Sequence, residues 1–245
     1  MFTALLHYDD ARRAAEVVEL LLGHGLRCAL TGGVAICAQL RAHRRPVDRR
    51  QLNDLDFVVE SFASIPESLT ESFLQHHVHP DASDGRMLLQ LIDEVRGIRI
   101  DLFRELGRTL SRSRPLDGDT GGMLRVLSVE DLVARTTALV CGRLRRGLTI
   151  DRKHTTALSR LRGLGQHAER ARAWADHRQQ VPGTFDEASR EAARLLAAHP
   201  ELVVVEEYAG TAVPCERCRE HGAFRPAPAV GIYSVANESA TYSGG

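Results

Sequence analysis

Two short segments of the chain carry strand-like patterns that include carboxylates. Residues 54–60 begin with Asp-Leu-Asp and continue with Phe and Val, and residues 97–104 place Ile and Leu on one face of a strand and Asp101 on the other. Successive strand side chains point to opposite faces, so Asp54 and Asp56 share a face. An ionised aspartate inside a strand is costly unless it is solvated, paired or metal-bound. The two segments therefore predict a β-sheet that carries three aspartates in need of partners.

The other patterns alternate between strand and helix at first and are helical afterwards. We predict helices over residues 11–23, 34–41, 64–78, 128–146, 151–164, 166–179 and 184–199. We predict further strands over residues 27–30 and 86–92, a turn over 79–84 and a loop over 108–122. This order favours an α+β fold, with a mixed sheet flanked by helices in residues 1–121. A helical C-terminal domain would follow in residues 122–209 and a flexible tail in 210–245.

Composition excludes several classes of protein. The 245 residues include 32 basic and 32 acidic ones, so no overall field draws the chain to nucleic acid or to an anionic membrane. No apolar run approaches the roughly 20 residues that span a bilayer. The N-terminal residues lack the pattern of a secretory signal, and five scattered cysteines do not suggest a disulfide framework. We expect a cytoplasmic protein without a membrane partner.

The sequence Thr31-Gly32-Gly33 lies between a predicted strand and a predicted helix. Glycines at such a turn let the backbone approach a phosphate, and the helix N-terminus supplies free N–H donors. A Gly-Gly pair alone usually marks only a turn. Paired carboxylates such as Asp54 and Asp56 are the ligands that Mg²⁺ prefers. A glycine turn, then Asp-x-Asp, then one strand aspartate is a more specific combination than any of its parts.

This ordered set resembles the nucleotidyltransferase superfamily related to DNA polymerase β. The stretches LTGGVAICAQL, RQLNDLDFVV and IRIDLF resemble the abortive-infection toxin nucleotidyltransferases in particular. The stretch LSVEDLVARTTAL, followed by DRKHTTALSRL, resembles the helical segment of those toxins. The resemblance implies that Gly32 and Gly33 cradle a nucleoside triphosphate and that Arg50 and Lys153 contact it. Lys153 is also the one lysine among the 32 basic residues.

The same resemblance implies catalytic and metal-binding roles for Asp54, Asp56 and Asp101, with two Mg²⁺ ions, or Mn²⁺ in their place. The implied reaction transfers a nucleoside monophosphate from an NTP to an acceptor, which would be a tRNA, a protein or a small molecule. Such toxins act in toxin–antitoxin or phage-defence systems, so an antitoxin is an expected partner. Two positions depart from the family: Leu52 replaces a small hydroxyl residue, and Arg135 stands where several relatives have lysine.

Two other functions stay open at this point. One is a non-catalytic nucleotide-binding module of the same fold, which acts as a regulator or interaction partner. The other is an interaction protein whose helical half and tail do the work. A degenerate relative usually lacks one of the three carboxylates, whereas this chain has all three, which favours the enzyme.

Two further motifs are weaker. Cys215-x-x-Cys218-x-x-His221 offers three ligands, but a structural zinc site needs four, so the alternative is a tail turn with free thiols. The arginine-rich residues 41–50 either contact the phosphates of a polynucleotide acceptor or simply solubilise the chain.

Overall fold

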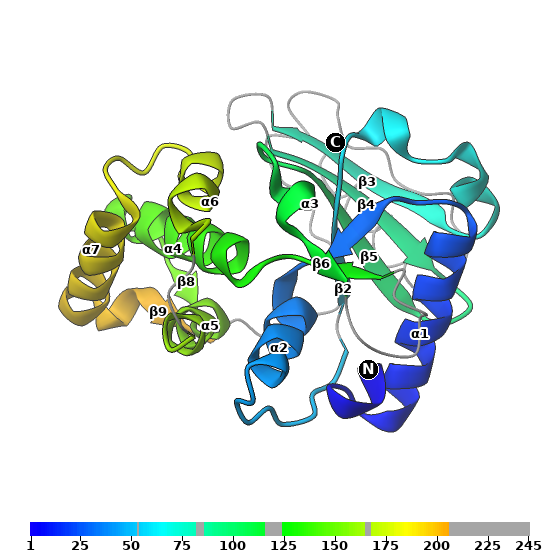
Figure 1. Ribbon diagram of the computed structural model, residues 1–245, viewed down its shortest axis with the longest axis horizontal. Helices are drawn as coiled ribbons and strands as arrows, with labels where there is room; N and C mark the ends of the chain where they lie inside the picture. The colour runs from blue at the N-terminus through cyan, green and yellow to red at the C-terminus, as the bar shows by residue number, and fades with distance from the viewer. Residues whose placement is uncertain (53, 82–85, 116–123, 165–167, 206–245) are drawn as a thin grey trace, which may run out of the picture.

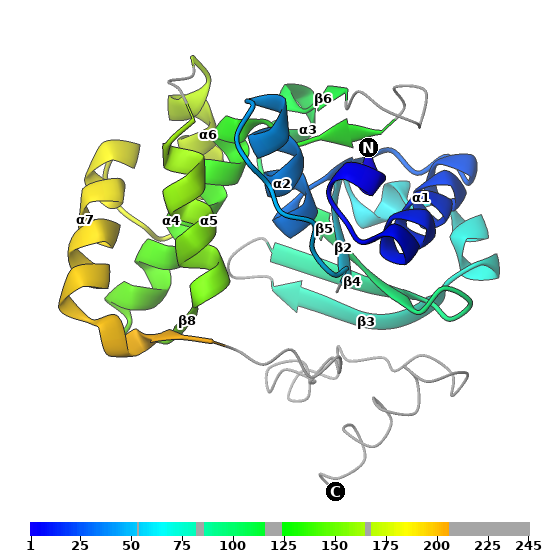
Figure 2. The ribbon, with the colours of Figure 1, turned by 90° about the horizontal axis from the view of Figure 1, so that it is seen from below.

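A mixed β-sheet forms the centre of the molecule (Figures 1 and 2). The computed structural model describes residues 1–52, 54–81, 86–115, 124–164 and 168–205. The seven strands of the sheet run in the order β3-β4-β5-β2-β1-β7-β6. Their bounds are β1 Cys28–Leu30, β2 Asp54–Val59, β3 Leu74–Asp81, β4 Arg86–Asp93, β5 Ile98–Arg104, β6 Arg114–Pro115 and β7 Arg125–Val126. The β2/β5 and β1/β7 pairs are parallel, and the other neighbours are antiparallel.

Helices lie against the sheet and beside it. The helices are α1 Tyr8–Gly23, α2 Gly32–Ala42, α3 Thr109–Arg112, α4 Val129–Arg145, α5 Arg152–Arg162, α6 Arg170–His177 and α7 Phe185–Ala198. Figure 2 shows α1 and α2 on the same side of the sheet. Helices α5, α6 and α7 pack against α4, on the left in Figure 1. A two-stranded parallel pair, β8 Ile150–Asp151 and β9 Val203–Val204, lies among them.

The apolar face of the sheet explains why β2 and β5 form where they do. Leu55 and Phe57 on β2 lie opposite Ile100 and Leu102 on β5, and all four side chains are fully buried. Burying one such side chain contributes about 1.5–3 kcal/mol. The intervening residues, which include the three aspartates, therefore lie on the other face.

Most predicted helices and strands are confirmed, with ends that differ by a few residues. In the sequence, Asp131 follows Ser128 by three residues, a spacing typical of a helix start. The Ser128 side chain indeed accepts a hydrogen bond from the backbone N–H of Asp131 at the start of α4. Helix α7 has a full capping box formed by Thr184 and Glu187. Side-chain hydrogen bonds to the first turn therefore define these two helix starts.

The predicted helix over residues 64–78 is wrong. Residues Glu67–Glu71 form a short 3₁₀ helix, and β3 occupies Leu74–Asp81 and runs into the predicted turn at 79–84. Pro66, a residue suited to the first turn of a helix, precedes only this 3₁₀ helix. Pairing with β4 along the whole of β3 determines the structure here rather than local periodicity.

The predicted loop over residues 108–122 also contains regular structure, namely α3 and β6, and the short strands β8 and β9 were not predicted. Two-residue strands are too short to show an alternating pattern. The proposed boundary at residue 121 and the tail at 210–245, with Cys215, Cys218 and His221, lie outside the described residues. The division into domains stays a prediction.

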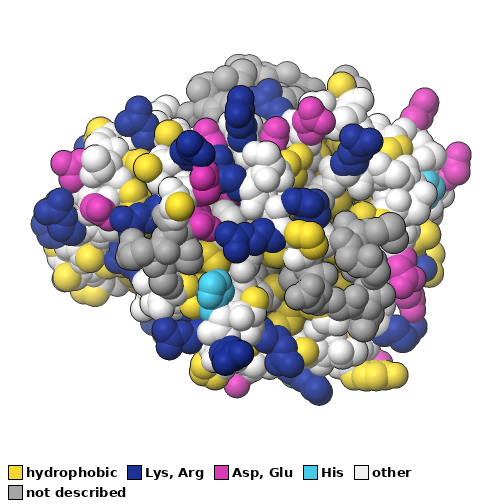
Figure 3. All heavy atoms as spheres, in the orientation of Figure 1, with side chains coloured by type: hydrophobic (Ala, Val, Ile, Leu, Met, Phe, Trp, Pro, Cys, Tyr) yellow, Lys and Arg dark blue, Asp and Glu magenta, His cyan; other side chains and the backbone are white. Residues whose placement is uncertain are grey.

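Charges of both signs are spread over one face of the molecule. In the space-filling view, acidic side chains lie between the more numerous basic ones (Figure 3). In the part of the chain that the structure describes, no helix is long and apolar enough to cross a membrane.

Candidate active site

The strand register brings the three predicted aspartates together. In the parallel pair of β2 and β5, Asp56 lies directly opposite Asp101, and Asp54 lies opposite Arg99. All four side chains share the face of the sheet that is turned away from the apolar core. Asp101 is buried, with 6% of its surface exposed, and Asp54 and Asp56 are half-buried. We call Asp54, Asp56 and Asp101 the carboxylate cluster.

Arg99, on β5 like Asp101, bridges two members of the carboxylate cluster. Arg99 Nη2 lies 2.5 Å from Asp54 Oδ2, and Arg99 Nε lies 3.2 Å from Asp101 Oδ1. Gln90 on β4 donates a hydrogen bond of 3.0 Å to the same oxygen of Asp101. From the sequence, Arg99 and Arg104 were both open as ion-pair partners of Asp101, but neither was predicted as a site residue. The signal was available, because a residue two positions before Asp101 on a strand must share its face.

Burial and mutual repulsion disfavour the ionised form of two members of the carboxylate cluster. Burial, and then the charges of Asp54 and Asp101, raise the pKa of Asp56 to about 7, against the opposing effect of Arg135 and Arg99. Burial also raises the pKa of Asp101. Raised carboxyl pKa values mean that the cluster gains from any added positive charge, either a proton or a cation.

The two glycines of the predicted phosphate turn contact the predicted site residues. Gly32 begins α2 with a φ of +65°, and a Cβ atom there would lie 1.8 Å from Asp56 Oδ2. A Cβ atom on Gly33 would lie 2.1 Å from Arg50 Nη1. Residue 32 therefore needs a glycine, whereas a side chain at residue 33 would first have to displace the guanidinium of Arg50. The first N–H groups of a helix have no partners within the helix and are suited to an anion.

A second arginine reaches this site from α4. Arg135 Nη1 donates a hydrogen bond of 2.9 Å to Thr31 Oγ1, and its guanidinium lies 4.4 Å from the centre of the Phe103 ring. Thr31 directly precedes α2, and its backbone N–H donates to the carbonyl oxygen of Asp56. In the sequence, Arg135 stood out only as a departure from the lysine of several relatives. The structure adds it to the surroundings of the carboxylate cluster.

Lys153 has a different position from the other predicted nucleotide-binding residues. It lies in the first turn of α5, its side chain is 62% exposed, and its Nζ lies 3.2 Å from Asp151 Oδ2. The described structure thus pairs Lys153 with the residue that caps its own helix, whereas Gly32 lies against Asp56 and Gly33 lies against Arg50. A nucleotide-binding role of Lys153 stays a prediction.

The cluster offers oxygen ligands, but it is not arranged as a finished metal site. Among the described residues, no group of three or more His, Cys, Asp and Glu side chains is placed so that it could hold a metal ion. Arg99 occupies the position between Asp54 and Asp101. The donor chemistry and the raised carboxyl pKa values still suit a hard divalent cation, provided that Arg99 gives up at least one of its two contacts.

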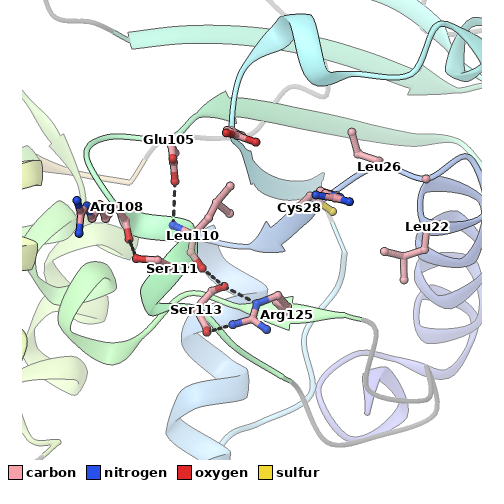
Figure 4. Close-up of a pocket in the computed structure, with 12 residues that line it drawn as sticks. Leu22, Leu26, Cys28, Glu105, Arg108, Leu110, Ser111, Ser113 and Arg125 are labelled. Carbon is pink, nitrogen blue, oxygen red and sulfur yellow. Dashed lines mark hydrogen bonds between the residues drawn. The ribbon is translucent and has the colours of Figure 1, made fainter.

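A cavity of about 810 Å³ lies elsewhere, at the opposite ends of the same strands (Figure 4). It is lined by Cys28 at the start of β1 and by Glu60 and Glu105 just beyond the ends of β2 and β5. Another lining residue, Arg125, donates a hydrogen bond of 2.7 Å to Ser113 Oγ. The residues that line this cavity do not include the carboxylate cluster, so its size has no bearing on the candidate site.

Comparison with known proteins assigns no family to the chain: no family model matches it, and no curated protein matches it significantly. Any function has to be inferred from the geometry and from the sequence patterns.

Proposed function

We propose that the chain is a metal-dependent nucleotidyltransferase, which transfers a nucleoside monophosphate from an NTP to the hydroxyl group of an acceptor. The observation that carries this proposal is the in-register carboxylate cluster on β2 and β5, placed directly against the glycine start of α2. The proposal includes a nucleotidyltransferase-like sheet and a helical C-terminal domain. A cytoplasmic location, an acceptor that is a tRNA, a protein or a small molecule, and an antitoxin partner also belong to it.

Each member of the site has a distinct task in this reaction. Two bound Mg²⁺ ions would supply charge neutralisation and activation of the acceptor oxygen. Asp54 and Asp56 would hold both ions, and Asp101 would face the acceptor. The acceptor oxygen forms a bond to the α-phosphorus, and the bond from that phosphorus to the bridging oxygen of the β-phosphate breaks, which releases pyrophosphate. Asp101, whose pKa is raised by burial, is suited to accept the acceptor's proton.

Positive groups around the cluster would position the triphosphate. The N–H groups at the start of α2 and the adjacent Arg50 would contact phosphate oxygens from one side. Arg135 would add charge from α4. Lys153 would join them only after it leaves Asp151. Positioning and charge stabilisation are the main contributions of a protein to this type of transfer.

Binding and acceptor identity can be tested in one series. Calorimetric titration with each of the four NTPs and Mg²⁺ measures binding, and incubation of α-phosphate-labelled NTPs with a crude lysate shows which molecules become labelled. We expect one preferred NTP and a labelled acceptor with the wild type, and binding without labelling with Asp101→Asn. Absence of NTP binding would contradict the proposal at its first step.

A non-catalytic nucleotide-binding module is the second candidate. One observation favours it: Arg99 already pairs with two of the three carboxylates, as a fixed cation would. Such a module would bind an NTP without labelling any acceptor. The variant Arg99→Met separates the two functions. In the enzyme, it should raise the affinity of the carboxylate cluster for divalent cations. A module that uses no catalytic metal should remain inactive in this variant, as in the wild type.

A further inference from the structure

An arginine of α3 holds a fully buried aspartate of α4. Arg112 Nη2 lies 2.7 Å from Asp131 Oδ1, and Arg112 Nε also donates to Asp131, with 3.1 Å to Oδ2. Ser128 Oγ lies 2.6 Å from Asp131 Oδ2, and His177 Nε2 lies 3.0 Å from Oδ1. Asp131 has no exposed surface. We call Arg112, Asp131, Asp176 and His177 the Arg112 clasp.

The clasp extends to α6. Arg112 Nη2 lies 2.7 Å from Asp176 Oδ2, and the backbone N–H of Arg108 donates to the same oxygen. Gly107, with a φ of +59°, leaves room for this carboxylate, since a Cβ atom there would lie 2.0 Å from Asp176 Oδ1. The segment after β5 is therefore fixed to both α4 and α6 by charged groups that lie mostly in the interior.

One turn further along α4, Arg135 lies beside the candidate active site. Arg135 follows Asp131 by four residues, so the two side chains lie on one face of the helix. Asp131 is fixed by Arg112, and Arg135 meets Thr31 and the ring of Phe103 beside the carboxylate cluster. One turn of α4 is thus held by the Arg112 clasp at Asp131. The next turn contacts Thr31 and Phe103 through Arg135.

We propose that Arg112 is a positioning residue: through its pair with Asp131 it sets the place of α4, and thereby holds Arg135 against Thr31 and the carboxylate cluster. Arg112 itself touches none of the aspartates of the cluster. A bidentate guanidinium fixes both the distance and the orientation of its partner, which a single lysine ammonium does not. The effect of this positioning on catalysis depends on the proposed function, whereas the placement of Arg135 does not.

The placement can be measured without any activity. Phenylglyoxal modifies accessible arginines, and mass spectrometry of the digested protein reports the rate at Arg135. We expect this rate to rise about tenfold in Arg112→Met, as for residues coupled in one network. The matched control is Arg96→Met, because Arg96 is likewise partly buried and pairs with two carboxylates, Asp93 and Glu16, far from α4. The control should leave the rate at Arg135 unchanged.

A second variant covers the case in which Arg112→Met does not fold. Arg112→Met combined with Asp131→Asn removes both charges of the pair, so no buried charge is left without a partner. Arg135 should become reactive in this variant too, and Arg112→Lys should restore protection only in part. Unchanged protection of Arg135 in the folded variants would overturn the proposal.

Kinetics then show whether Arg112 acts through Arg135. If it does, the double variant Arg112→Met/Arg135→Gln should lower kcat/KM no further than Arg135→Gln alone. Losses that multiply would show that Arg112 acts by another route and would overturn this role. If the wild type transfers no nucleotide, the proposed function is wrong. The phenylglyoxal labelling of Arg135 still tests whether Arg112 positions Arg135.

Discussion

A Cβ atom on Gly32 would lie 1.8 Å from Oδ2 of Asp56, so α2 can begin where it does only because residue 32 has no side chain. The backbone of Gly32 is also left-handed, with a φ of +65°. This close approach places the predicted phosphate-binding turn directly against a predicted metal ligand. Any side chain at residue 32 must displace either the start of the helix or the carboxylate.

Gly32→Ala should therefore lose nucleotide transfer and stability together. The left-handed backbone alone costs an alanine about 1–2 kcal/mol. The contact with Asp56 adds about 1–3 kcal/mol, as overpacking does elsewhere. Gly147→Ala is the matched control, because Gly147 has a φ of +66° and open space around its Cβ position. Urea unfolding of both variants isolates the contact, and equal losses would show that Gly32 does not constrain Asp56.

Asp54→Asn and Asp56→Asn should each lower the transfer rate by about 10²–10³-fold, the scale for removing one charge-stabilising group. Neither should unfold the protein, because each removes repulsion within the carboxylate cluster. Turnover and Tm would be measured on the same samples. Asp48→Asn, at an exposed aspartate, is the control. Full activity in both cluster variants would refute the metal assignment.

The pH dependence of stability should reveal the raised pKa of Asp56. Its pKa of about 7 in the folded protein lies above the ordinary 3.8, so the folded state binds this proton more tightly. Without divalent cations, this group therefore lowers stability as pH rises from about 4 to about 7. The gain in Tm of Asp56→Asn over the wild type should be larger at pH 8 than at pH 4. A gain that is the same at both values would show that Asp56 titrates normally.

The Arg112 clasp should have the opposite pH response. Burial alone would raise the pKa of Asp131, but hydrogen bonds from His177, Arg112 and Ser128 outweigh it and lower the pKa below its ordinary value. The stability that this carboxylate contributes is present above the unfolded pKa of about 4 and is lost as pH falls through the lower folded pKa. Between pH 5 and pH 2, the Tm should fall less steeply with pH in Asp131→Asn than in the wild type. Parallel curves would contradict the lowered pKa.

Lys153→Ala should weaken NTP binding if the lysine leaves Asp151 for the triphosphate, and Lys153→Arg should restore only part of it. An exposed bystander would instead change the binding free energy by no more than about 0.5 kcal/mol. Dissociation constants for the three proteins at fixed Mg²⁺ decide between these outcomes. Three equal constants would leave Lys153 as a local partner of Asp151.

The sequence predicts which aspartates form the candidate site better than it predicts how they are arranged. Alternation within each strand was enough to place Asp54 and Asp56 on one face and Asp101 away from the apolar face of β5. The register that sets Asp56 opposite Asp101 depends on long-range pairing, which no local pattern records. The bridging position of Arg99 depends on the same pairing.

Tertiary contacts explain the remaining differences. Arg112 and Asp131 are 19 residues apart, and only the tertiary fold brings them together as an ion pair. Similarly, β3 is a strand because β4 pairs with it, and local periodicity does not record this pairing. Helix starts such as Ser128 were predictable because their hydrogen bonds close within three residues.

The most direct test of the central claim compares two labels on the same nucleotide. The protein is incubated with lysate, Mg²⁺ and an NTP labelled at either the α- or the γ-phosphate. Transfer of a nucleoside monophosphate predicts that the α-label remains on an acceptor and that the γ-label leaves with pyrophosphate. Asp101→Asn should abolish labelling, and Asp48→Asn should preserve it. Failure of all four α-labelled NTPs to label any acceptor, with Mg²⁺ or Mn²⁺, or full labelling by Asp101→Asn, would contradict the claim.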